Sequence, residues 1–292
     1  MYELIRVSDR CYYIDSPAKV GVLELGEGQV CLIDSGNDKD AGKRALKVLN
    51  AQSWQLKTVY NTHSHADHIG GNGYLQRQTG CEIFAPGLEC AFANAPILEP
   101  ISLFGANPPG ELKHKFLLAQ ESRVCPLEEA ILPEGLTPIP LPGHSFAMVG
   151  YRTGEDVVFL ADALASRETL DKYAIAFVYD VGQYLTTLEG VKTMEARCFI
   201  PAHAPVTEDI RPLAQYNIEK VQEVADKILA LCSKPSTFET LLQGLFACYG
   251  LTMNFQQYAL VGSTLRSYLS WLCETGQLTA GFENNLLLWE RC

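Results

Sequence analysis

The sequence predicts an α/β fold: a large layered domain with mixed sheets, followed by a small domain of three helices and a β-hairpin. Three observations predict it. Four short strand patterns separated by turn residues open the chain, so the first sheet begins with antiparallel pairs. Strands then alternate with helices as far as residue 203, which is typical of a layered α/β domain. From residue 207 the pattern changes to long helices and ends in two short strands.

The elements of the large domain follow from the period of the apolar residues and from the turn residues between them. The expected strands are 2–7, 11–15, 19–26, 29–34, 56–62, 81–86, 136–144, 148–154, 156–162 and 198–203. The expected helices are 40–52, 66–80 and 184–196, and Gly80 closes the second of them.

Residues 87–130 interrupt this alternation. They are rich in proline and glycine and carry the aromatic residues Phe92, Phe104 and Phe116. Long irregular insertions in compact enzymes are more often functional lids than accidents, so we expect this segment to cover the active site and shape substrate choice. The three aromatics fit a pocket lining or ordinary packing. His114 is expected on a solvent-facing helix, with a substrate contact as the alternative.

The end of the chain has the element order of a winged helix. An apolar stripe with alternating steps of four and three residues predicts a long helix over 207–232. The remaining elements are a helix opened by the capping-box spacing of Ser236 and Glu239 and closed by Gly250, a helix from Asn254 to Gly276, and strands 277–281 and 286–290. We therefore predict a catalytic domain over 1–219 and a winged-helix-like domain over 220–292.

Charge and cysteine placement restrict the partners and the compartment. Acidic residues outnumber basic ones by 34 to 23, which disfavours nucleic acid and anionic membranes and leaves a small-molecule substrate. A homodimer is left open. The first residues lack the apolar core of a signal peptide and no apolar window reaches the length of a membrane span, so we expect a cytoplasmic protein. The ten cysteines form no CxxC pair and are expected to be free thiols in the core.

The most informative segment is Thr-His-Ser-His-Ala-Asp-His over 62–68. His63 and His65 are two residues apart on a segment that leaves a strand, so their imidazoles point to the same side. Asp67 and His68 follow where the chain turns into a helix, so they can point toward a second position nearby. One corner therefore supplies ligands to two metals. Imidazole and carboxylate suit zinc, and they also suit iron or manganese.

Further candidate ligands stand at strand ends. His144 ends the strand from 136, Asp162 ends the strand from 156, and His203 ends the strand from 198. Each is a weak signal alone. Together they are a strong one, because one site then accounts for five of the six histidines.

In this order the motifs resemble the metallo-β-lactamase superfamily, over about residues 1–210. The resemblance implies an αββα sandwich with the site at the edge between two sheets. It implies one metal at His63, His65 and His144, a second at Asp67, His68 and His203, Asp162 bridging both, and Asp34 fixing the histidine loop. From the sequence alone, Asp34 is equally well a turn residue that ends a strand.

Two positions indicate the branch of the superfamily. Asp162 stands where the zinc lactamases typically carry cysteine, so the set looks more like glyoxalase II enzymes, lactonases and ribonucleases. Ser145 follows His144, whereas glyoxalase-like members usually have a second glycine soon after this histidine. This departure, and the lack of a basic cluster near the C-terminus, disfavour glutathione thioesters as substrates.

The expected function is that of a dinuclear metal-dependent hydrolase. A hydroxide shared by two divalent ions attacks a small ester, thioester or lactone, and Asp67 orients it and passes its proton on. Zinc is the expected metal. One alternative is an endoribonuclease with the winged helix positioning RNA, although its third helix carries a single cation, Arg266. Another is an iron enzyme similar to a persulfide dioxygenase, which uses one iron, so the seven-residue set argues against it.

Overall fold

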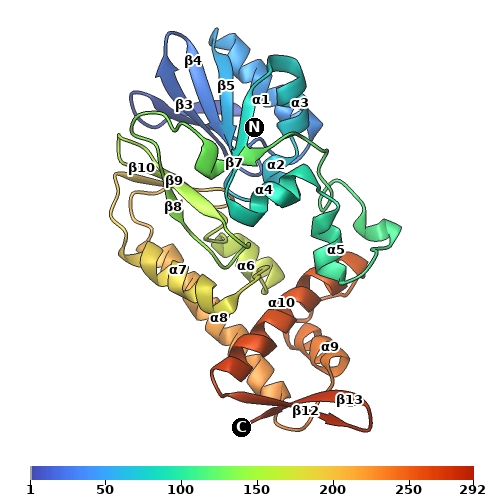
Figure 1. Ribbon diagram of the computed structural model, residues 1–292. Coiled ribbons are helices and arrows are strands. Elements are labelled where there is room, and N and C mark those ends of the chain that lie inside the picture. Colours follow the sequence, from blue (N-terminus) through green and yellow to red (C-terminus); the bar gives the residue numbers. More distant parts are fainter. Residues whose placement is uncertain (1) are drawn as a thin grey trace.

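The computed structural model describes residues 2–292 and shows two sheets packed face to face, helices on their outer sides and a helical C-terminal part (Figure 1). The first sheet has the order β1-β2-β3-β4-β5-β6-β7, antiparallel as far as β4 and parallel from there on. Its strands are β1 Glu3–Arg6, β2 Cys11–Asp15, β3 Val20–Gly26, β4 Gln29–Ile33, β5 Gln55–Tyr60, β6 Glu82–Ala85 and β7 Cys125–Pro126.

The second sheet has the order β11-β10-β9-β8. Its strands are β8 Thr137–Pro140, β9 Val149–Arg152, β10 Val157–Ala161 and β11 Cys198–Pro201. A shared apolar core lies between the two sheets and contains Tyr13 and Cys31 of the first and Tyr151 and Phe159 of the second. Six of the ten cysteines are buried and all ten are free, as expected.

Helices cover the outer face of each sheet. On the first sheet they are α1 Lys39–Ala51, α2 Ala66–Ile69 and α3 Asn72–Thr79, and on the second α6 Arg167–Tyr173, α7 Val181–Thr193 and α8 Arg211–Leu231. The layers therefore run helix, sheet, sheet, helix. Each outer layer buries the apolar face of its sheet against an amphipathic helix, which is the arrangement that layered α/β domains require.

The helix predicted over 66–80 is wrong in one respect: it is two helices, α2 and α3, that meet at Gly70 and Gly71. A Cβ at Gly70 would lie 2.4 Å from the carbonyl carbon of Asn37, and one at Gly71 would lie 2.3 Å from the carbonyl oxygen of Ser35. Only glycine permits this close approach of two backbones, so the chain changes direction there. Gly80 ends α3 with a φ of 70°, as predicted.

The segment 87–130 is more regular than its composition suggested. It contains α4 Gly87–Asn94, α5 Leu98–Phe104, the short 3-10 helix η1 Gly110–Leu112, strand β7 and a second short 3-10 helix, η2 Leu127–Glu129. His114 lies in a turn that follows η1, so its expected place on a helix is wrong. The carbonyl of His114 accepts hydrogen bonds from two later amides, which closes the turn.

The C-terminal part consists of α8, α9 Phe238–Tyr249, α10 Phe255–Glu274 and the hairpin β12 Leu278–Glu283 with β13 Leu286–Arg291. The predicted order of three helices and a hairpin is confirmed. Helix α9 begins one residue later than the capping box implied, because the hydroxyl of Thr237, and not that of Ser236, accepts from the third helical amide.

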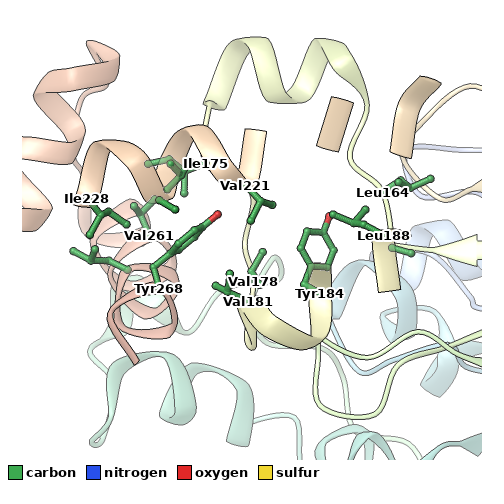
Figure 2. Close-up of a cluster of buried hydrophobic side chains, with 14 of the residues drawn as sticks. Leu164, Ile175, Val178, Val181, Tyr184, Leu188, Val221, Ile228, Val261 and Tyr268 are labelled. Carbon is green, nitrogen blue, oxygen red and sulfur yellow. The ribbon is translucent and has the colours of Figure 1, made fainter. Parts of the chain in front are cut away.

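Helix α8 crosses the predicted boundary between residues 219 and 220 without a break. Figure 2 shows one continuous cluster there, with Leu188 of α7, Val221 and Ile228 of α8, and Tyr268 of α10. The C-terminal helices therefore share a core with the outer layer of the second sheet. Among residues 2–292, no helix combines the length and the apolar composition of a membrane span.

Candidate metal centre

The seven predicted ligands lie on four segments that each follow a strand. His63, His65, Asp67 and His68 follow β5, His144 follows β8, Asp162 follows β10 and His203 follows β11. The structure brings them into two neighbouring groups of potential metal ligands, in each of which the donor atoms lie within 4.8 Å of one another. The first group is His63, His65 and His144, and the second group is Asp67, His68, Asp162 and His203.

The first group is a triangle of imidazole nitrogens. Nδ1 of His65 lies 3.1 Å from Nε2 of His63 and 3.1 Å from Nε2 of His144. Burial lowers the pKa of His65 to about 4, and burial together with the neighbouring His65 lowers that of His144 to about 4. These imidazoles are therefore neutral at pH 7, the form that binds a metal.

The outer nitrogen of each of four histidines faces an acceptor, which fixes the tautomer. Nδ1 of His144 lies 3.1 Å from the Phe177 carbonyl, and Nδ1 of His203 lies 2.8 Å from the Pro17 carbonyl. A carbonyl only accepts, so each Nδ1 carries a proton, and in the neutral imidazole each Nε2 therefore turns a lone pair inward.

Asp34 determines the other two tautomers. Its Oδ2 accepts from Nδ1 of His68 at 2.8 Å and from the hydroxyl of Thr62 at 2.8 Å. Because that hydroxyl donates its single proton to Asp34, it can only accept from Nδ1 of His63, which lies 3.0 Å away. Asp34 is buried, and its Oδ1 also accepts from the amide of Thr62 at 2.8 Å. Asp34 thus contacts the histidine loop at three positions, and its role in fixing that loop stays a prediction.

The second group has two buried polar atoms without a hydrogen-bond partner, Nε2 of His68 and Oδ1 of Asp162. They face each other at 3.1 Å. With Nδ1 protonated, both atoms present lone pairs, and two such atoms in a buried site require a cation between them. This is the observation by which the donor set fits a metal ion.

A proton can meet the same requirement. Burial opposes it, but the carboxylates of Asp162, Asp67 and Asp34 raise the pKa of His68 well above its usual range. Asp162 likewise raises the pKa of His203 to about 10. Nε2 of His203 lies 3.0 Å from Oδ2 of Asp67 and 3.4 Å from Oδ2 of Asp162. The second group thus attracts positive charge strongly.

Asp162 reaches both groups. Its Oδ2 lies 3.6 Å from Nε2 of His144 in the first group, while its Oδ1 faces His68 in the second. This placement is what a carboxylate that bridges two metals requires.

Helix α10 supports the first group through residues 177–179. The hydroxyl of Thr264 accepts from the amide of Val178 at 3.3 Å, and that of Ser267 donates to the carbonyl of Tyr179 at 2.6 Å. The ring of Phe177 lies edge-on to His65, with 5.3 Å between centroids, while its carbonyl holds His144. None of these contacts is visible in the sequence, since they join residues that lie between 33 and 112 positions apart.

Two glutamates of the segment 87–130 also lie at the site, and sequence reasoning missed both. Glu89 of α4 is buried and accepts hydrogen bonds from residues beside the histidines of the first group. Burial and the negative charges of Asp67 and Glu89 raise the pKa of Glu99 on α5 well above its usual range. Neither residue belongs to a sequence motif. The only signal in the sequence was a single acidic residue among neighbours expected to be buried.

A cavity of about 750 Å³ opens from His144, Asp162 and His203. Its walls come from residues 164–177 and from the first half of α10, including Gln256, Gln257, Leu260, Val261 and Thr264. No residue of 87–130 lines this cavity. That the segment covers the metal site and shapes substrate choice stays a prediction.

The aromatics of the segment 87–130 pack elsewhere. Phe92 contacts Phe146 with 4.6 Å between ring centroids, and Phe104 approaches Phe255 of α10 at 6.2 Å. Phe116 is 55% exposed. Glu89 and Glu99 of this segment lie at the metal centre, and Phe104 packs against α10. The first half of α10 forms part of the cavity wall.

Sandwich layers and paired ligand groups at the strand ends define a class of metal-binding α/β proteins. The chain belongs to the Metallo-beta-lactamase superfamily, which it matches over residues 14–203. Its relatives are hydrolases, which is consistent with a metal-dependent hydrolase, and the superfamily binds metal ions.

Two solved structures share the fold over almost the whole chain. A metallo-beta-lactamase family protein from Thermus thermophilus superposes with a TM-score of 0.72 at 21% identity, covering 99% of this chain and 98% of that one. A beta-lactamase domain protein from Burkholderia ambifaria gives a TM-score of 0.72 at 16% identity, covering 99% and 94%. The C-terminal helices and hairpin are therefore part of the shared fold.

The curated relatives match over shorter stretches. A hydroxyacylglutathione hydrolase from Methylococcus capsulatus is 38% identical over 60 residues, 20% of this chain and 22% of the relative. An atrochrysone carboxyl ACP thioesterase from Aspergillus fumigatus is 26% identical over 207 residues, 70% of this chain and 57% of the relative. The chain thus spans about a fifth of the first and somewhat over half of the second.

Proposed function

We propose that this protein is a dinuclear zinc hydrolase of small esters, thioesters or lactones, and that thioesters are its principal substrates. The observation that carries the proposal is the set of inward lone pairs, above all the unpartnered Nε2 of His68 facing Oδ1 of Asp162. Three imidazoles in one group, and two imidazoles with two carboxylates in the other, suit zinc. Iron and manganese accept the same donors.

When bound, the two metals would lower the pKa of water so that it attacks at neutral pH, and would polarise the scissile carbonyl. The chain supplies the remaining functions. Asp67 is the proposed proton acceptor, because its side chain is 36% exposed and can reach a water molecule, while His203 holds one carboxylate oxygen in place. Asp162 would hold both metals at a fixed separation.

The shape of the cavity favours an acyl substrate. It begins at the ligand groups and continues between residues 164–177 and α10, where Leu164, Ile175 and Leu260 offer apolar contact. Gln256 and Gln257 add amides that can hydrogen-bond a carbonyl or hydroxyl. An acyl chain can occupy this space with its carbonyl at the metals.

The activities for which the relatives are named support a thioester. One is a hydroxyacylglutathione hydrolase and the other an ACP thioesterase. The glutathione conjugate is the less favoured carrier, because Lys172 is the only lysine or arginine that lines the cavity of the described chain. A carrier with few carboxylates fits this acidic site better.

We propose that the C-terminal part, in its winged-helix order, acts as a pocket wall and not as a nucleic-acid module. Helix α10 faces the cavity, and the net charge of −11 opposes binding of phosphate backbones. The division at residue 219/220, a cytoplasmic location and a homodimer remain predictions.

A thiol-release assay tests the function. Zinc-loaded protein should hydrolyse short acyl thioesters, and Asp67→Asn should lower kcat by 100-fold or more, on the order of a lost general base. Asp226→Asn on the exposed face of α8 is the matched control and should retain full activity. No thioester turnover, together with RNA cleavage that Asp67→Asn abolishes, would replace the carbonyl substrate with a phosphodiester.

A further inference from the structure

The carboxylate of Glu89 lies between the two loops that carry the first group of ligands. One loop holds His63 and His65 with Ser64 between them, and the other holds His144 followed by Ser145. Glu89 itself stands on α4, outside both loops, and has no exposed surface.

Each oxygen of this carboxylate serves one loop. Oε2 accepts from the amide of Ser64 at 3.0 Å and from its hydroxyl at 2.6 Å. Oε1 accepts from the hydroxyl of Ser145 at 2.7 Å and from the amide of Ala147 at 2.9 Å. Two loops that are about 80 residues apart in sequence are thus joined through a single side chain.

The backbone around α4 permits this close contact. Gly87 begins the helix with a φ of 43°, and a Cβ there would lie 3.1 Å from Cβ of Ala147. The absence of a side chain lets the second loop approach the start of α4 and brings its donors within reach of Glu89.

We propose that Glu89 is a positioning residue that sets the spacing of His63, His65 and His144 and thereby the metal affinity of the first group. The inference rests on the proposed metal centre. Residues that orient ligands from outside the coordination sphere typically change metal affinity by about 10- to 100-fold. The second group depends on Asp34, Pro17 and its own carboxylates for orientation, so Glu89 should leave it almost unchanged.

Glu89→Gln is the informative substitution because it keeps the shape and replaces one acceptor oxygen with an NH2 group. A serine hydroxyl can turn and accept from that group, but the amide of Ser64 or of Ala147 cannot. One loop therefore loses an obligatory acceptor and moves away from the other.

Zinc affinity is measured by competition with a chelating dye in two backgrounds. His203→Ala weakens the second group and reports the first, while His144→Ala weakens the first group and reports the second. We expect Glu89→Gln to weaken zinc binding in the first background by about 10- to 100-fold and in the second by less than about threefold.

Two further variants separate positioning from charge and from folding. Ser145→Ala keeps the negative charge and removes one hydrogen bond, so it should weaken the first group by about 3- to 10-fold, even if Glu89→Gln fails to fold. Asn94→Ala on the same helix loses four hydrogen bonds with Val124 and Cys90, away from the ligands, and should leave both affinities unchanged.

The outcomes are distinct. Normal zinc affinity of the first group in Glu89→Gln and Ser145→Ala, with reduced stability of the chelator-treated protein, means that Glu89 is only structural and overturns the proposal. Absence of zinc uptake in both reporting backgrounds overturns the metal centre itself, and this proposal with it.

Discussion

Substituting Asp34→Asn should disturb both groups of ligands at once. The side chain can keep its bond from the amide of Thr62 through Oδ1. Its NH2 group then stands where Oδ2 was, 2.8 Å from Nδ1 of His68 and 2.8 Å from the hydroxyl of Thr62. Asp34 has a φ of 64°, a left-handed conformation that asparagine also tolerates, so the backbone should not change.

Replacing this acceptor oxygen with a donor NH2 group changes the proton positions of its partners as well. Nδ1 of His68 must now accept, which moves its proton to the metal-facing Nε2. The Thr62 hydroxyl must accept from the new amide and donate to Nδ1 of His63, which moves that proton inward as well. One histidine in each group then presents N–H where a lone pair is needed.

Each group should lose about 10- to 100-fold in zinc affinity, which corresponds to about 1.4–2.7 kcal/mol per site. Zinc titration against a chelating dye measures the binding step of each of the two groups. Asp38→Asn is the matched control, because Asp38 caps α1 four residues later and asparagine is an equally good cap. Zinc affinities of Asp34→Asn within twofold of the wild type at both steps would refute the tautomer reasoning.

Three further predictions concern stability and the pocket. His203 has a pKa of about 10 in the folded protein against 6.5 ordinarily, so the stability from its protonation is complete below about pH 6.5 and is lost as the pH rises through 10. Thermal melts of chelator-treated protein should therefore show a falling Tm from pH 7 to pH 9, and an equal fall in His203→Gln would contradict this. Leu260→Trp narrows the cavity and should raise KM for long acyl thioesters by about tenfold while sparing acetyl thioesters, as steady-state kinetics with both would show. Ile228→Ala in the cluster of Figure 2 should cost about 2–5 kcal/mol in urea unfolding, still as one transition, whereas early separate melting of the C-terminal part would indicate independent domains.

Strand-end ligands were the part of the site that could be predicted from the sequence. Histidine and aspartate are polar residues at the ends of apolar strands, and their placement in one loop cluster follows from the parallel order of β4, β5 and β6 and of β10 and β11. All seven converge in the structure.

The groups that hold these ligands could not be predicted. The carbonyls of Pro17 and Phe177 are backbone atoms with no sequence signature, and Glu89 acts across two loops that only the fold brings together. The walls of the cavity depend on the packing of α10 against residues 177–179, a tertiary contact that helix periodicity does not encode.

The local sequence was also misleading in two segments, 66–80 and 87–130. The apolar period over 66–80 continues through Gly70 and Gly71, and what divides the helix is the approach of residues 35–37, which lie far away in sequence. Proline and glycine in 87–130 suggested an irregular lid, yet the segment contains α4, whose Glu89 accepts hydrogen bonds from the ligand loops, and α5, whose Leu103 packs with Ala259 of α10.

The number of zinc ions bound per chain tests the proposed dinuclear centre most directly. Elemental analysis of zinc-titrated, gel-filtered protein should give about two ions per wild-type chain, the number that a bridged two-metal centre holds. Asp162→Ala, which removes the carboxylate that reaches both groups, should lower metal content and thioester turnover together. Full zinc occupancy and unchanged turnover in Asp162→Ala would contradict the bridged centre.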